Sequence, residues 1–115
     1  MTPETGFPVQ MIDGVPVVAA PQEIDITNAD ELRLALADAA THGRGRFVVD
    51  MTRTQFCDTA GLHALVTAHK RTQSEGGHVL LVMPDTGVLR IFAITGLDGV
   101  IAHVASLDEA LAQMR

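Results

Sequence analysis

The stretch RFVVDMTRTQFCDTAGLHALVTAHKRTQSEGGHVLLVMP, residues 46–84, carries the pattern that decides the fold. Its two ends, 46–51 and 78–83, are short apolar runs, and Pro84 stops the second run. Residues at the spacing of one helix face recur between the runs: Leu62, Leu65, Val66 and His69. Apolar runs around such a face predict two buried strands joined by a helix. We therefore expect a right-handed unit with parallel strands.

The preceding residues add a hairpin and a helix. Residues 9–12 and 15–20 are apolar runs separated by Asp13-Gly14, which is a strong hairpin signal. Thr27 and Asn28 then precede an apolar stripe that ends before Gly43, and this pattern predicts a capped amphipathic helix.

The residues after Pro84 continue the alternation. They predict a short helix over 88–94, an edge strand over 100–104 and a last helix that begins at the capping box of Ser106 and Glu109. The expected fold class is α/β: a small mixed sheet with parallel core strands, a hairpin strand at one margin and covering helices.

Composition limits the classes of protein that the chain can belong to. With 115 residues, 47% of them hydrophobic, and one cysteine, we expect a single domain over 1–115 that folds without disulfides. The apolar runs are too short for a membrane span and the start of the chain lacks a signal region, so we expect a cytoplasmic protein. A net charge of -6 and few aromatic residues argue against a nucleic-acid surface.

The charge is distributed unevenly along the chain. Residues 1–32 contain six of the 14 acids and none of the eight basic residues, so the remaining eight acids and eight bases balance. These six acids are Glu4, Asp13, Glu23, Asp25, Asp30 and Glu31. Clustered in space, they would form a negative face that attracts a basic partner.

Two loops follow parallel strands and should meet at one edge of the sheet. The loop over 21–27 carries Glu23 and Asp25, and the loop over 52–60 carries Asp58 and Thr59. Either Asp58 or Thr59 suits the N-cap of the next helix. The pattern is consistent with a plain helix cap and also with a phosphorylation switch, because free amides at a helix start tolerate a phosphate.

Five motifs together resemble the STAS domain family, in particular its stand-alone anti-sigma factor antagonists. They lie between residues 22 and 97: Gln22-Glu23-Ile24-Asp25, Asp50-Met51, Asp58-Thr59-Ala60-Gly61-Leu62, Gly76-Gly77 and Ile91-Phe92-Ala93-Ile94-Thr95-Gly96-Leu97. This resemblance implies a STAS fold. It also implies a partner, a kinase-type anti-sigma factor related to histidine-kinase ATPases, which phosphorylates the residue after the motif's Asp.

That resemblance places the phosphorylation site at Thr59. The implied partner-binding residues are Glu23, Asp25, Asp58, Thr59, Gly61 and Leu62. Three departures from the family pattern are Thr59 in place of the commoner Ser, Ala60 in place of a second hydroxyl residue, and Gln22 in place of Gly. An alternative is a STAS scaffold subunit of an ABC-transporter ATPase complex or a stressosome.

The other reactive side chains do not suggest catalysis. The five histidines lack metal-ligand spacing, and Cys57 has no cationic neighbour to activate its thiol. Because the chain has no phosphate-binding Gly-rich loop and no convergent acid and base, we expect no enzyme activity, no cofactor and no metal. The apolar segment over 7–9 could pair, as an edge strand, with a second copy of the chain.

Overall fold

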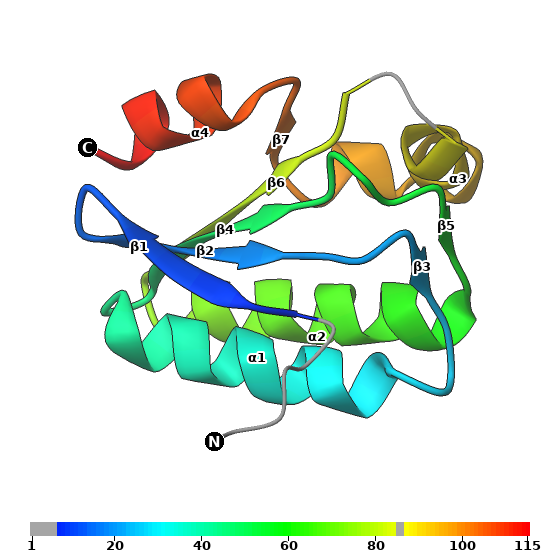
Figure 1. Ribbon diagram of the computed structural model, residues 1–115, viewed down its shortest axis with the longest axis horizontal. Helices are drawn as coiled ribbons and strands as arrows, with labels where there is room; N and C mark the ends of the chain where they lie inside the picture. Colours follow the sequence, from blue (N-terminus) through cyan, green and yellow to red (C-terminus); the bar gives the residue numbers. More distant parts are fainter. Residues whose placement is uncertain (1–6, 85–86) are drawn as a thin grey trace.

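Five strands form the central sheet of the computed structural model, which describes residues 7–84 and 87–115 (Figure 1). In spatial order they are β1 (Val9–Ile12), β2 (Val15–Ala19), β4 (Arg46–Asp50), β6 (His78–Val82) and β7 (His103–Val104). The pair β1 and β2 is antiparallel, whereas β2, β4, β6 and β7 run parallel to their neighbours. The predicted mixed sheet with parallel core strands is confirmed.

The hairpin between β1 and β2 turns at the predicted dipeptide. Asp13 and Gly14 have φ angles of 52° and 78°, and Ile12 pairs with Val15 on either side of them. Two consecutive residues with positive φ form the type of turn whose twist matches that of antiparallel strands, which explains why Asp-Gly occupies this position.

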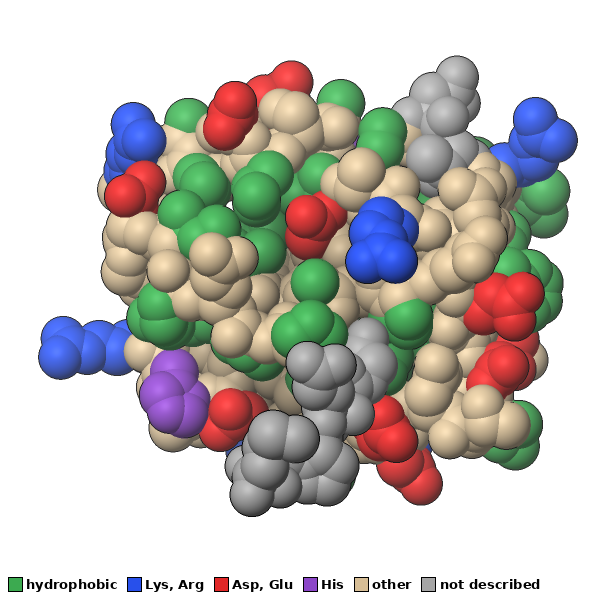
Figure 2. Space-filling view, viewed as in Figure 1, with side chains coloured by type: hydrophobic (Ala, Val, Ile, Leu, Met, Phe, Trp, Pro, Cys, Tyr) green, Lys and Arg blue, Asp and Glu red, His purple; other side chains and the backbone are tan. Residues whose placement is uncertain are grey.

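Helices cover the two faces of the sheet unequally. In Figure 1, α1 (Ala29–His42) and α2 (Thr59–Ser74) lie side by side under one face, and α4 (Leu107–Met114) lies on the other. The helix α3 (Gly87–Thr95) and the 3-10 helix η1 (Leu97–Gly99) follow β6 at the end of the sheet where its strands finish. Figure 2 shows hydrophobic side chains at the surface beside α4, on the less covered face.

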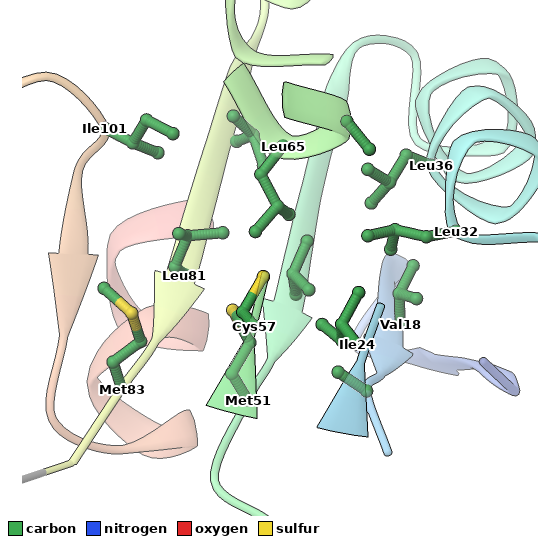
Figure 3. Close-up of a cluster of buried hydrophobic side chains, with 14 of the residues drawn as sticks. Val18, Ile24, Leu32, Leu36, Met51, Cys57, Leu65, Leu81, Met83 and Ile101 are labelled. Carbon is green, nitrogen blue, oxygen red and sulfur yellow. The ribbon is translucent and has the colours of Figure 1, made fainter. Parts of the chain in front are cut away.

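The larger core lies between the sheet and the pair α1 and α2. Figure 3 shows side chains of both helices and of β2, β4 and β6 pointing into one cluster. Among its members are Val18, Leu32, Leu36, Leu65 and Leu81, all at most 3% exposed. At about 1.5 to 3 kcal/mol for each fully buried large aliphatic side chain, this cluster is the main stabilising element of the fold.

A second, two-stranded sheet was not predicted. It pairs β3 (Glu23–Ile24) with β5 (Phe56–Cys57) in parallel, inside the two segments that we expected to be loops. The predicted edge strand over 100–104 is also shorter than expected, because Val100 follows η1 and only β7 pairs. Strands of two residues are too short to show alternation, so their pairing depends on tertiary packing.

We expected the segment over 7–9 to pair with a second chain as an edge strand. Phe7 is instead 1% exposed and belongs to the core, and within this segment Val9 alone belongs to the edge strand β1. None of the helices within residues 7–84 and 87–115 combines the length and the apolar character of a membrane span.

Candidate partner-binding site

The short β3–β5 sheet brings the two predicted acidic loops together. Glu23 lies opposite Phe56, and Ile24 lies opposite Cys57. The backbone amide of Asp58 continues this pairing by donating to the carbonyl of Ile24 at 3.0 Å. Residues 33 to 36 positions apart in the sequence therefore form one surface, which confirms the expected proximity of the loops. We call the part made by Glu23, Asp25, Asp58 and Thr59 the acidic rim.

Ile24 and Cys57 hold this surface against the core. Both side chains are at most 2% exposed and point into the cluster of Figure 3. Since successive side chains of an extended segment alternate between its two sides, Glu23 and Phe56 face outward. The exposure of these two residues agrees with that alternation.

The carboxylate of Asp58 connects the start of α2 to the loop before α1. One of its oxygens, Oδ1, accepts a hydrogen bond from the amide of Gly61 at 3.1 Å, and Oδ2 accepts one from the amide of Ile26 at 3.2 Å. Asp58 is therefore the N-cap of α2, which decides between the two candidates. Thr59 is the first residue of the helix, and its side chain is exposed.

Replacing Asp58 separates its two functions. Asp58→Ala should lower the free energy of unfolding by about 1 to 2 kcal/mol, because it removes the cap and the bond to the loop. Asp58→Asn should cost less, because the amide oxygen of asparagine can still cap the helix. The bond from the amide of Ile26 is lost in this variant too, since an NH₂ group cannot accept a hydrogen bond. Urea titration measures the stability, and amide hydrogen exchange should show Ile26 exchanging faster in both variants. Unchanged exchange at Ile26 would contradict the bridge.

The loop before α1 is ordered by its own side chains. Asp25 Oδ1 accepts hydrogen bonds from the amide of Thr27 at 2.9 Å and from the Thr27 hydroxyl. Asn28 accepts from the amide of Asp25 and donates its side-chain NH₂ to the carbonyl of Glu23, both at 2.9 Å. Asn28 is the N-cap residue of α1, but its side chain makes no capping bond because these loop contacts use it.

The charge of Asp25 stabilises this loop. The hydroxyl of Thr27, followed by its backbone amide, lowers the pKa of Asp25 below its ordinary value of 3.8. These bonds favour the ionised form, so the stability that they add is present above the ordinary pKa and is lost as the pH falls through the lowered one. The carboxylate is therefore charged at neutral pH and available to a cationic partner.

The remaining two residues of the predicted site, Gly61 and Leu62, are buried. A Cβ atom on Gly61 would lie 2.6 Å from both Cys57 Sγ and Ile24 Cγ2. At Gly61, α2 therefore lies close to the side chains under the β3–β5 sheet. Leu62 is 8% exposed and packs in the core. These two residues fix the position of Thr59 by packing.

The thiol of Cys57 lies beneath the rim. It is 2% exposed, and burial, with a smaller contribution from the charge of Asp58, raises its pKa to about 12. A thiol must ionise to act as a nucleophile, so Cys57 is unreactive at neutral pH. Cys57 therefore acts as a small buried apolar side chain in the core.

Alkylation should reveal this burial. We expect iodoacetamide at mildly alkaline pH to modify Cys57 at least tenfold more slowly in the folded protein than in concentrated urea, as followed by mass spectrometry. Because folding raises this pKa from its ordinary 9.0, the associated stability is complete below pH 9 and is lost as the pH rises toward 12. Equal alkylation rates in the two states would contradict the buried thiol.

No group of three or more His, Cys, Asp or Glu side chains that could hold a metal ion occurs among the residues that the structure describes. The acidic rim instead combines an exposed hydroxyl and three carboxylates on a backbone held by hydrogen bonds. Such a surface is suited to binding another protein and to modification at the hydroxyl.

Comparison with known proteins assigns the family. The model of the STAS domain family matches residues 7–110. The chain belongs to the STAS domain family. This STAS domain is 26% identical over 110 residues to a candidate anti-sigma factor antagonist of Thermotoga maritima, a match that spans 95% of this chain and 97% of that protein.

Solved structures agree with this assignment. The crystal structure of the candidate antagonist from Thermotoga maritima has a TM-score of 0.84 at 25% identity, covering 95% of this chain and 94% of the other. An anti-sigma factor antagonist from Mycobacterium paratuberculosis has a TM-score of 0.79 at 29% identity, with coverages of 95% and 92%. The predicted STAS fold is therefore confirmed, and these relatives are regulatory proteins.

Sequence reasoning missed the residues that join the two loops. Neither the β3–β5 pairing nor the bond between Asp58 and Ile26 has a local pattern that would reveal it. One signal was present for Ile26: it is an apolar residue in a polar loop, between Asp25 and Thr27. It is 79% exposed, although isoleucine is one of the residue types most often buried.

Proposed function

We propose that this STAS domain is a cytoplasmic anti-sigma factor antagonist that binds a kinase-type anti-sigma factor through the acidic rim. Binding frees the sigma factor, and phosphorylation of Thr59 by the partner ends the complex. The general role is supported by the anti-sigma factor antagonists among its relatives. The observation that carries the switch is the exposed hydroxyl of Thr59, directly after the N-cap of α2 and beside the carboxylate of Asp58.

The geometry around Thr59 supports a modification that leaves the fold intact. Its side chain is exposed and the amides of the first helical turn lie nearby, so a phosphate can be added without entering the core. The added charge of about -1.5 to -2 would stand next to Asp58. In a complex that covers the rim, the partner's cations are already paired with the rim carboxylates, so this added charge would lose water without gaining a cation.

The role proposed for each residue follows from its position. Glu23, Asp25 and Asp58 supply negative charge to a basic partner surface, and Thr59 accepts the phosphate. Gly61 and Leu62 belong to the same site because they hold the start of α2 in place from below. The partner supplies the ATP and the catalytic groups.

A phosphorylation assay tests this proposal. The protein is incubated with ATP and a kinase-like anti-sigma factor from the same organism, and the modified residue is located by mass spectrometry. We expect one phosphate on Thr59 and none in Thr59→Ala. Thr67→Ala serves as a matched control, because Thr67 is also an exposed threonine of α2. Modification at another residue, or none in the wild type, would refute the proposed switch.

A further inference from the structure

Two exposed apolar side chains border the acidic rim. Ile26 is 79% exposed and Phe56 is 49% exposed. The amide of Ile26 is bonded to Asp58, and Phe56 lies opposite Glu23 in the β3–β5 sheet, so each apolar residue is attached to a residue of the rim. Figure 2 shows acidic and hydrophobic side chains interleaved along the margin where Figure 1 places β3, β5 and the start of α2.

Ile26 stands on a loop that is fixed on both sides. Before it, the backbone amide of Asp25 donates to Asn28; after it, Thr27 donates to the carboxylate of Asp25. Its own amide is bonded to Asp58. A side chain whose backbone is already ordered loses less conformational freedom when it is buried by a partner, so binding through Ile26 carries a low entropic cost.

Phe56 is positioned by the same short sheet. Its strand neighbour Cys57 points into the core, so the aromatic ring faces out on the side that carries Glu23. Protein interfaces concentrate binding energy in a few apolar or aromatic side chains surrounded by polar residues. Ile26 and Phe56 among the carboxylates of the rim have this arrangement.

We propose that Ile26 is the main apolar anchor of the complex with the kinase-type partner, and that Phe56 makes a second contact. The inference rests on the proposed function and specifies the surface that the function uses. The partner surface that fits is an apolar pocket bordered by Lys or Arg, which would receive Ile26 while its cations face Glu23 and Asp25.

Charge selects this partner over a second copy of the chain. A symmetric dimer through the same surface would place the carboxylates of the two rims near each other, in a protein whose net charge is already -6. Like charges facing each other across an interface oppose association. A basic partner gains from the same carboxylates.

The anchor also explains why a phosphate on Thr59 would be effective. Asp58, which precedes Thr59, holds the amide of Ile26, so the modified hydroxyl lies beside the contact that excludes water. A phosphate there must be desolvated when Ile26 is buried. Burial of Ile26 by the partner therefore makes phosphorylation of Thr59 unfavourable for binding.

The test compares Ile26→Ala with Leu34→Ala. Leu34 is a matched control because it is a similarly exposed apolar residue, 73% exposed, on the outer side of α1. Affinity for the anti-sigma factor is measured by calorimetry with ADP, and the KM for phosphorylation with ATP. We expect Ile26→Ala to weaken binding at least tenfold and raise the KM similarly, and Leu34→Ala to change either by less than twofold. Thermal unfolding should be unchanged in both.

Each outcome decides between the two proposals. Wild-type affinity for Ile26→Ala, together with phosphorylation of Thr59, would overturn the anchor and leave the proposed function standing. Equal losses in Ile26→Ala and Leu34→Ala would also overturn it, because the effect would not belong to this surface. If the wild-type protein neither binds the kinase nor is phosphorylated, both proposals fail. A loss confined to Ile26→Ala supports the anchor.

Discussion

Gly61→Ala is expected to lower the free energy of unfolding by about 3 kcal/mol, at the upper end of the usual cost of overpacking. The added methyl group would lie 2.6 Å from both Cys57 Sγ and Ile24 Cγ2, which is far inside contact distance. Both neighbouring side chains are buried, at most 2% exposed, so they cannot move into solvent. The helix would have to shift away from the β3–β5 sheet, and Thr59 would shift with it.

Gly99→Ala is the matched control for this prediction. A Cβ atom on Gly99 would have no neighbour within 4 Å, and its backbone does not have the positive φ that favours glycine. Urea titration of the two variants and the wild type measures the difference. A loss of stability that is equal in Gly61→Ala and Gly99→Ala would show that packing under the rim is not the cause.

Much of the fold was predictable because its main elements are long enough to show a period. The strands β2, β4 and β6 contain continuous apolar runs of three to five residues, and α1 and α2 present clear apolar stripes. The hairpin followed from one dipeptide whose residues accept positive φ. The order of these elements, together with the handedness of parallel crossovers, was sufficient to place the two acidic loops at one edge.

The details of the site were less predictable because they depend on contacts between distant segments. The β3–β5 pair has two residues in each strand and forms since Ile24 and Cys57 enter the core together. Asp58 and Thr59 were equally good caps by residue type, and the additional acceptor site for the amide of Ile26 distinguishes Asp58 only in three dimensions. Asn28 was expected to cap α1, but the loop uses its side chain.

Thr59→Glu should weaken binding to the kinase-type anti-sigma factor at least a hundredfold, whereas Thr59→Ala should bind within about threefold of the wild type. A carboxylate at this position adds a charge beside Asp58 on a rim that a complex would cover. Desolvating an unpaired charge costs several kcal/mol, and each 1.4 kcal/mol corresponds to a tenfold change in affinity. Alanine removes the hydroxyl without adding a charge, and the exposed side chain makes no contribution to the core.

Calorimetry against the anti-sigma factor with ADP measures both affinities, and a Thr67→Glu variant controls for charge added elsewhere on α2. Because α2 begins at Thr59 and the cap is made by Asp58, none of these variants removes a bond that holds the helix, so their unfolding transitions should stay close to that of the wild type. Equal affinities of Thr59→Glu and Thr67→Glu would mean that the complex does not cover the start of α2. A selective loss at Thr59 would instead require the partner to lie over this hydroxyl, where the kinase reaction would take place.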